Sequence, residues 1–587
     1  MVAMGGSLGS RAAVRGSGRA ERAPEASALS RLPISVITLI AAVGVFVSSV
    51  GYSLGRQTTA PNSSAGDVLY WLGQALILIP IAGRLLSRRT LTSGQTVGLL
   101  TVLTVAQYLL KVNYSPLGFT FNDEFLHYRG TANMLASGKL FEVNYGLPIG
   151  THYPGIEEVT SALISATGLS IFEAGLIVAG LAHLLFICFL YLAFVVSIRS
   201  HRIAGIAVLI YYATPSLTSF NSMFVYETLA LAFLAFCIFA GLKSAIDKSE
   251  YARKRWFAVA VLCILAAVSA VAVTCWIAFI ARDTISYFSP TVLGIVQGLE
   301  SLQKSGSSDA PTTGGSPLDN EVLEGIGLLL FTILIAVGSW QAWKRHRRHP
   351  WIIGMMIGGA LGWVVALGIR LGTPDGQELA GRAATYIYIP VSVLVALALT
   401  KLVNSSPVRR YGAAVTALVV AAVVMLLFDG LANGWPPFWE RLPGTHLVAS
   451  FERSVDPEEI RISDWSLTAL GPGNRIAADA GLYPVLIGYG DQNSLEDVDY
   501  LWSTPTWTPA IVSQANADEV QYVETDTRTT KGPLPAAGTY FPDDPNNAVS
   551  PIAPAAIAKY DTIPGVARVY DDGTIRLYNL MTLGYVP

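Results

Sequence analysis

Six side chains of the kinds that bind substrates and move protons lie within one polar stretch of the chain, residues 119–155. They are Asp123, Glu124, His127, Tyr128, Arg129 and His152. A carboxylate in partly desolvated surroundings can take a proton from a substrate hydroxyl. Histidine, tyrosine and arginine side chains can hydrogen-bond the same substrate. This stretch is therefore the first candidate for a functional site.

The beginning of the stretch, NDEFLHYRGTANMLASG, has the sequence signals of a short helix over residues 123–137. Asn122 suits the N-cap position, and Gly138 suits the position that ends a helix. The polar side chains would then project from a helix rather than from an irregular loop.

On this helix Asp123 and His127 are four residues apart, and Glu124 precedes His127 by three, so the three can share a face. We expect Asp123 to be the catalytic base, with Glu124 as the second candidate. The alternative is that both acids only complement the helix dipole. A divalent metal bound by Asp123, Glu124 and His127, together with His152, is a further hypothesis, although the spacing is not the HExxH of zinc proteases.

Further ionisable residues lie where apolar segments begin or end. Glu227 begins one apolar segment, Arg370 ends another, and Glu378 and Arg382 precede a third. Charged groups at membrane depth are costly and indicate either a function or a buried pair. Glu378 and Arg382 could form an ion pair at four-residue spacing, whereas Arg370 or Arg382 could hold a phosphate. Together with His127, Tyr128, Arg129 and His152, these four residues are the predicted substrate-binding set.

The composition requires that these residues be positioned by membrane helices. The chain has 587 residues, of which 52% are hydrophobic and 14% charged, and its mean hydropathy is +0.48. Apolar segments long enough to span a bilayer recur. They predict about eleven transmembrane helices, at 33–53, 67–86, 94–112, 172–197, 203–219, 222–242, 256–280, 321–342, 351–371, 383–400 and 411–430.

The connecting segments predict the orientation of these helices. Lysine and arginine gather in alternate loops and in the N-terminal tail, residues 1–32, which is rich in Gly, Ala, Ser and Arg and is predicted to be disordered. By the positive-inside rule that side is the cytoplasm. The transmembrane domain at 33–432 would then carry two outward loops, 113–171 and 282–320. The predicted location is the plasma membrane, with the N-terminus in the cytoplasm.

After the last apolar segment the composition changes. Strand-like runs such as RIAADAGLYPVLIGYG and VARVYDDGTIRLYNL predict a small α/β domain at 436–587, outside the membrane and extracytoplasmic. The second run contains Asp572-Gly573 between two strand-like segments, which predicts a β-hairpin.

Four motifs together resemble the GT-C superfamily of polytopic glycosyltransferases, particularly actinobacterial members with a C-terminal extracytoplasmic domain. The motifs are NDEFLHYRG, HYPGIEEVTSAL, YETLAL and ELAGRAATYIYIP. The resemblance covers residues 94–400 in kind. One departure is that two extra spans precede the acidic loop, whereas the typical arrangement has one.

The resemblance implies transfer of a sugar from a polyprenyl-phosphate-linked donor to a cell-envelope acceptor, which is a glycan, a lipid or a protein. It implies that the catalytic acid lies in the first outward loop, where Asp123 is the matching residue. Arg370 or Arg382 would stabilise the departing phosphate. Neither a P-loop nor a GxGxxG motif that opens a helix occurs, which fits a lipid-linked donor. No nucleic-acid partner is expected.

Two other functions fit parts of the pattern. A transporter or flippase would use Glu227, Glu378 and Arg382 as a substrate or proton path, although the apolar segments show no inverted repeat. A non-enzymatic envelope protein would use the C-terminal domain to bind a glycan.

Overall fold

The computed structural model describes most of the chain. It covers residues 32–57, 64–87, 91–215, 217–246, 273–282, 318–347, 350–372, 376–404, 406–433, 441–449, 455–495, 498–531, 540 and 551–581. The predicted tail at 1–32, most of the span predicted at 256–280 and most of the loop predicted at 282–320 lie outside these residues.

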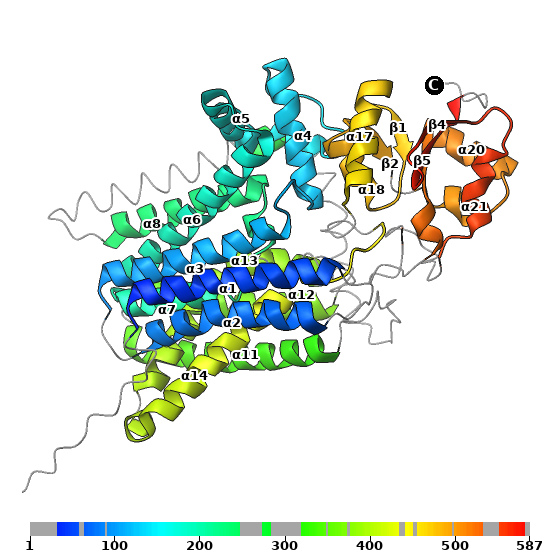
Figure 1. The fold of residues 1–587 in the computed structure, drawn as a ribbon. Coiled ribbons are helices and arrows are strands. Elements are labelled where there is room, and N and C mark those ends of the chain that lie inside the picture. The colour runs from blue at the N-terminus through cyan, green and yellow to red at the C-terminus, as the bar shows by residue number, and fades with distance from the viewer. Residues whose placement is uncertain are drawn as a thin grey trace, which may run out of the picture.

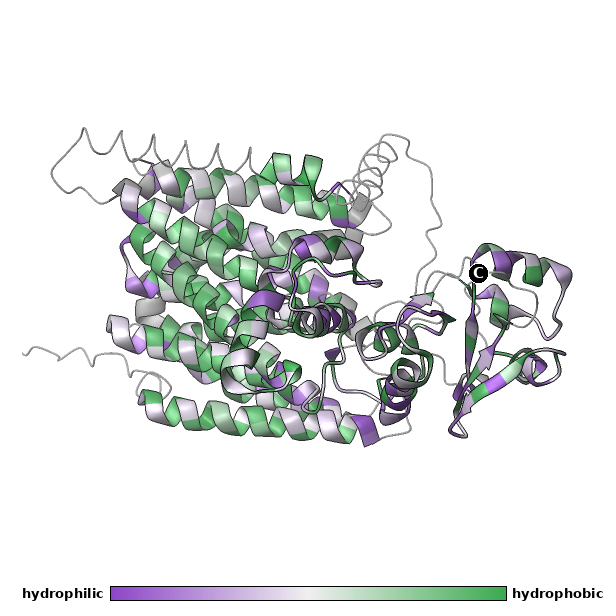
Figure 2. Cartoon of the chain, turned by 90° about the horizontal axis from the view of Figure 1, so that it is seen from above, coloured by the Kyte–Doolittle hydropathy of each residue, from purple (hydrophilic) through white to green (hydrophobic). Residues whose placement is uncertain are grey.

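A bundle of long apolar helices dominates the structure and confirms the predicted polytopic helical membrane fold (Figures 1 and 2). Within the described residues, nine helices are long and apolar enough to cross a membrane. They are α1 (Ile34–Gln57), α2 (Ser64–Leu86), α3 (Ser93–Tyr114), α6 (Ile171–Ile198), α8 (Tyr226–Ile246), α11 (Leu318–His346), α12 (Pro350–Gly372), α13 (Gly376–Asn404) and α14 (Ser406–Ala432).

The segment predicted as a span at 203–219 has a different form. Its helix, α7 (His201–Tyr211), is only 11 residues long, and irregular backbone leads through the 3-10 turn η3 (Phe220–Ser222) to α8. Irregular backbone is tolerated at membrane depth where protein surrounds it, and η3 is buried. The Asn221 side-chain amide donates to Thr385 Oγ1 at 2.8 Å, which ties this segment to α13.

The polar stretch folds as three short elements between α3 and α6. These are α4 (Asn122–Ser137), the 3-10 helix η2 (Pro148–His152) and α5 (Gly155–Thr167). The predicted end at Gly138 is confirmed, since this residue adopts the left-handed conformation with φ of 67°. The predicted N-cap is wrong: Asn122 is the first helical residue, and Phe121 occupies the cap position without a side-chain hydrogen bond.

The C-terminal part beyond the bundle contains a mixed five-stranded sheet in the order β2-β1-β3-β5-β4. The strands are β1 (Arg475–Ala477), β2 (Asn493–Leu495), β3 (Tyr522–Asp526), β4 (Ala567–Asp571) and β5 (Ile575–Asn579). The helices around it are α17 (Pro457–Leu470), α18 (Leu482–Gly488), α19 (Tyr500–Ser503), α20 (Pro509–Ala517) and α21 (Pro554–Ala558), with the 3-10 turns η4 (Thr527–Thr530) and η5 (Lys559–Asp561). Strand β1 pairs in parallel with β2 and β3, whereas β5 is antiparallel to β3 and β4.

The two runs that suggested strands have different outcomes. The hairpin forms as predicted, because β4 and β5 pair on either side of Asp572-Gly573 and Gly573 supplies the positive φ. The run RIAADAGLYPVLIGYG is a strand only at β1, and its apolar second half is the helix α18. A short apolar run fits a buried helix as well as a strand, and here α18 packs against α4 and α17.

Candidate functional site

Glu124 ties three elements together at the start of α4. Its side chain is fully buried and forms an ion pair with Lys111, which is itself buried in the last turn of α3. The same carboxylate oxygen, Oε1, accepts the backbone N–H of Phe224, just before α8, at 2.9 Å. A buried charge is stable only when it is paired, so these contacts give Glu124 a structural role.

Asp123, one residue earlier, has contrasting surroundings. Its side chain is half-buried. Within the described residues its carboxylate has neither a hydrogen-bond partner nor an ion-pair partner. It lies close enough to Glu227 for the two carboxylates to repel each other. Of the two predicted catalytic acids, Asp123 is therefore the one that a substrate can reach.

Glu227 connects Asp123 with residues of α13. The Tyr386 hydroxyl donates to Glu227 Oε1 at 3.5 Å, and Arg382 interacts attractively with Glu227. The Arg382 guanidinium carbon also lies 5.2 Å from the centroid of the Phe220 ring. We call Asp123, Glu227, Arg382 and Tyr386 the outer cluster. The structure thus brings together three of the predicted site residues from α4, α8 and α13.

His127 forms a buried pair that the sequence did not indicate. Its Nδ1 lies 2.6 Å from Glu157 Oε1 of α5, and both side chains are buried. The imidazole also packs edge-on against Tyr226, with the ring centroids 5.0 Å apart. Glu157 therefore fixes the orientation of the imidazole beside the outer cluster. The only sequence signal for Glu157 is the second acidic pair, in PGIEEV, at the start of α5.

Tyr128 and Arg129 face the C-terminal part of the chain. The Arg129 guanidinium donates to the carbonyl oxygens of Gly488 and Tyr489, each at 2.9 Å, at the end of α18. Tyr128 packs on the Tyr489 ring, with the centroids 4.8 Å apart. Burial lowers the pKa of Arg129, and nearby Asp491 opposes this shift. Both residues fasten α18 to α4; that they bind substrate stays a prediction.

The substrate-binding roles predicted for His152 and Glu378 stay predictions. His152 is half-buried at the end of η2. Glu378 lies in the first turns of α13, but its side chain is outside what the structure describes, so the predicted pair with Arg382 is not tested.

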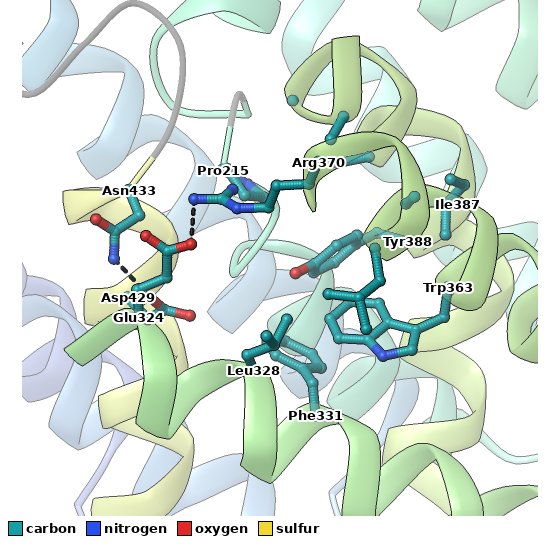
Figure 3. Close-up of a pocket in the computed structure, with 15 residues that line it drawn as sticks. Pro215, Glu324, Leu328, Phe331, Trp363, Arg370, Ile387, Tyr388, Asp429 and Asn433 are labelled. Atoms are coloured by element: carbon teal, nitrogen blue, oxygen red, sulfur yellow. Dashed lines mark hydrogen bonds and ion pairs between the residues drawn. The ribbon is translucent and has the colours of Figure 1, made fainter. Parts of the chain in front are cut away.

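Arg370 lies in a different place, a pocket between the ends of α11, α12, α13 and α14 (Figure 3). It forms an ion pair with Glu324 of α11, and close by the Asn433 amide donates to Asp429 Oδ1 at 2.8 Å. Phe331, Trp363 and Tyr388 line the apolar side. We call this the α11–α14 pocket. Its empty space, which is partly open to solvent, is about 650 Å³.

Helix α13 separates the two places. Its residues Ala384 and Tyr388 line the α11–α14 pocket, whereas Arg382 and Tyr386 face the outer cluster. Residues two apart on a helix, such as Arg382 and Ala384, point in nearly opposite directions. Arg370 and Arg382, the two arginines predicted to hold a phosphate, therefore lie in different places.

The metal hypothesis gains no support from this arrangement. In the part of the chain that the structure describes, no group of three or more His, Cys, Asp or Glu side chains is placed to hold a metal ion. Glu124 and His127 are instead occupied by Lys111 and Glu157.

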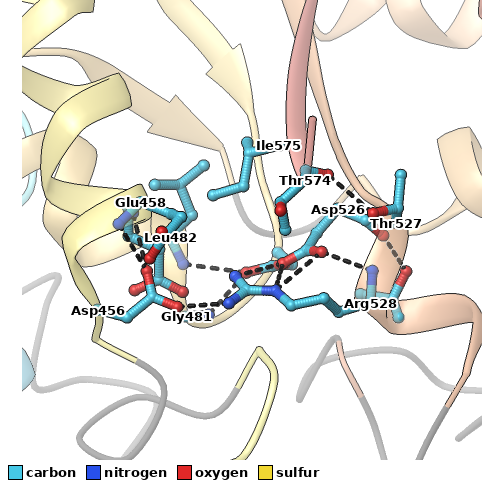
Figure 4. Close-up of polar contacts among 12 residues, drawn as sticks. Asp456, Glu458, Gly481, Leu482, Asp526, Thr527, Arg528, Thr574 and Ile575 are labelled. Atoms are coloured by element: carbon cyan, nitrogen blue, oxygen red, sulfur yellow. Dashed lines mark hydrogen bonds and ion pairs between the residues drawn. The ribbon is translucent and has the colours of Figure 1, made fainter. Parts of the chain in front are cut away.

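A second group of acids lies in the C-terminal part, around Arg528 (Figure 4). Arg528 Nε donates to Asp526 Oδ2 at 2.8 Å, and its Nη1 pairs with Asp456. Buried near them are Glu459, Asp479 and Glu524. Burial and the neighbouring carboxylates raise the pKa of Asp479 to about 7 and raise the pKa values of Glu459 and Glu524 as well.

Comparisons of the sequence with models of protein families and with curated proteins found no match.

We predict that Asp123 and its neighbour Glu124 differ sharply in their effect on stability. Glu124→Ala leaves the Lys111 ammonium buried without its counter-ion and should cost about 3–5 kcal/mol. Asp123→Ala removes no hydrogen bond or ion pair of the carboxylate within the described residues and should change stability by about 0.5 kcal/mol or less. Thermal unfolding of both purified variants in detergent micelles measures the difference. Equal losses would contradict the assignment of the two acids.

We also predict that the acids around Arg528 make the C-terminal part less stable as the pH rises. In the unfolded chain these carboxyls lose their protons near pH 4, whereas Asp479 holds its proton to about pH 7 when folded. The folded state thus binds more protons between these values, so stability falls with rising pH across this window and stays lower above it.

Glu524→Gln tests this prediction, because Glu524 is fully buried and its Oε1 has no hydrogen-bond partner within the described residues. At pH 8 the free energy of unfolding of the variant should exceed that of the wild type by about 1 kcal/mol or more. It should also change less with pH. Unfolding of the full chain from pH 5 to 8 is the measurement, with Glu519→Gln, at an exposed carboxylate of the same part, as control. An unchanged slope would rule out a destabilising Glu524 charge.

Proposed function

We propose that the protein is a glycosyltransferase that moves a sugar from a polyprenyl-phosphate-linked donor to a cell-envelope acceptor at the outer face of the plasma membrane. The observation that carries the proposal is the half-buried Asp123 carboxylate, which has no partner among the described residues and lies beside Glu227 at the end of the helix bundle. The motifs that resemble the GT-C superfamily place a catalytic acid at this position.

The orientation agrees with the helix directions. Arg84, Lys243, Lys344 and Lys401 lie near the C-terminal ends of α2, α8, α11 and α13. Helix α4, which carries Asp123, and the C-terminal part lie at the opposite end of the bundle (Figure 1). With the basic end in the cytoplasm, the outer cluster faces outward, where a lipid-linked donor carries its sugar.

In the proposed reaction Asp123 takes the proton of an acceptor hydroxyl as that oxygen bonds to the anomeric carbon of the donor sugar. The bond between the anomeric carbon and the phosphate oxygen breaks, and the polyprenyl phosphate leaves with the bonding electron pair. Arg382 is the cation best placed to stabilise the charge on that phosphate. In the His127–Glu157 pair, Glu157 orients the His127 imidazole beside Tyr226, which is a positioning role.

The charges of the outer cluster constrain this mechanism. Asp123 and Glu227 outnumber the single guanidinium of Arg382, so the cluster is short of positive charge for a phosphate. A divalent cation that arrives with the donor phosphate would supply that charge, and the Asp123 and Glu227 oxygens suit such an ion.

We predict that Asp123→Asn lowers the rate of transfer at least about 100-fold, because general-base catalysis contributes about that much or more. The assay supplies membranes that contain the full-length protein with a panel of polyprenyl-phosphate monosaccharides and follows incorporation of labelled sugar into envelope material. Glu158→Gln is the matched control, since Glu158 is an exposed carboxylate of α5, the helix that packs against α4.

A folded Asp123→Asn variant with wild-type transfer would refute the proposal. Loss of uptake or of lipid translocation, without loss of transfer, would favour the transporter function. Addition of EDTA should lower transfer only if a divalent cation accompanies the donor.

A further inference from the structure

The α11–α14 pocket is amphipathic and lies at one end of the bundle. Its polar end is formed by Glu324 near the start of α11, Arg370 in the last turn of α12, and Asp429 with Asn433 at the end of α14 (Figure 3). Its apolar wall contains Leu328, Phe331, Trp363, Leu367, Ile387 and Tyr388. A molecule with a polar head and an apolar tail matches this division.

The polar groups of the pocket include both donors and acceptors. Arg370 and Asn433 donate hydrogen bonds, and Glu324 and Asp429 accept them. A phosphate oxygen can only accept and an ammonium group can only donate, whereas a sugar hydroxyl does both. A hydroxyl-rich head group is therefore the one that can use every polar side chain here.

The charges of the pocket point the same way. The positive charge of Arg370 is already balanced by Glu324 in a direct ion pair, and the third ionisable group, Asp429, is an acid. The polar end therefore has no excess positive charge to attract a phosphate. An ammonium head group, in turn, has no acceptor for the Arg370 and Asn433 donors.

The aromatic rings favour the same ligand. Phe331, Trp363 and Tyr388 pack together, with ring centroids 5.2 to 6.0 Å apart, beside the polar end. Trp363 is held in place by its indole N–H, which donates to Thr332 Oγ1 at 3.2 Å. Such rings offer apolar faces to the C–H side of a sugar ring and to an alkyl chain.

We propose that the α11–α14 pocket binds an uncharged glycolipid, with the sugar hydroxyls on Asp429, Glu324 and Arg370 and the lipid chain along Trp363 and Leu367. Because α13 lies between this pocket and Asp123, the glycolipid occupies a second site and not the place of proton transfer. The proposal does not depend on the proposed function.

The test compares three amphiphiles with the same tail. Purified full-length protein is mixed with decyl β-glucoside, decyl phosphate or decylammonium, and bound molecules are measured by native mass spectrometry, with and without Mg²⁺. We expect decyl β-glucoside to bind at least about tenfold more tightly than the other two. A preference for decyl phosphate or decylammonium, or equal binding of all three, would overturn the proposal.

Variants locate the binding. Asp429→Leu removes an acceptor and should weaken glucoside binding about tenfold, whereas Asp429→Asn should lose less glucoside affinity and admit more decyl phosphate. Leu367→Trp should fill the pocket and abolish binding, while Leu361→Trp, the same change at an exposed site of α12, should not. Glucoside binding that Leu367→Trp leaves unchanged would place the ligand elsewhere and overturn the proposal. Where a variant fails to fold, the comparison of head groups on the wild-type protein decides.

Discussion

The buried ion pair between Lys111 and Glu124 fixes the geometry of the candidate site. Both side chains are almost completely removed from water, which is costly unless the two charges remain together. The pair therefore holds the end of α3 against the start of α4, and the N–H of Phe224 adds the beginning of α8. Asp123 precedes Glu124 by one residue, so a turn of about 100° around the helix directs its carboxylate away from this pair. Glu124 therefore holds the helices together, and the carboxylate of Asp123 remains accessible.

The other side of α4 is fixed by the C-terminal part of the chain. Arg129 binds the carbonyl oxygens at the end of α18, where a cation also complements the helix dipole. Phe119 and Phe125 share one apolar cluster with Val485 and Leu486 of α18. The C-terminal part thus helps to position Asp123. A substitution at the contact between α4 and α18 would therefore shift Asp123 even though every residue of the outer cluster is unchanged.

The features that the sequence predicted correctly are those that interactions between neighbouring residues determine. The end of α4 at Gly138 and the β4–β5 hairpin follow from neighbouring residues, and both predictions are confirmed. The roles of Glu124 and Arg129 depend on partners 13 and about 360 residues away, at Lys111 and α18, and their spacing could not reveal them. The segment at 203–219 was predicted as a span from its apolar composition. Its helix, α7, ends at Tyr211, and contacts such as Asn221 to Thr385 stabilise the irregular backbone that follows.

The two polar sites on either side of α13 differ in how their carboxylates are engaged. Each site has two carboxylates and one arginine. In the α11–α14 pocket Glu324 is paired with Arg370, and Asp429 accepts a hydrogen bond from Asn433. In the outer cluster the Asp123 carboxylate has no such contact in the described chain and lies near the like charge of Glu227. The proposed proton transfer needs a carboxylate that its neighbours leave accessible. Asp123 meets this condition, whereas both acids of the pocket are already engaged by neighbouring side chains.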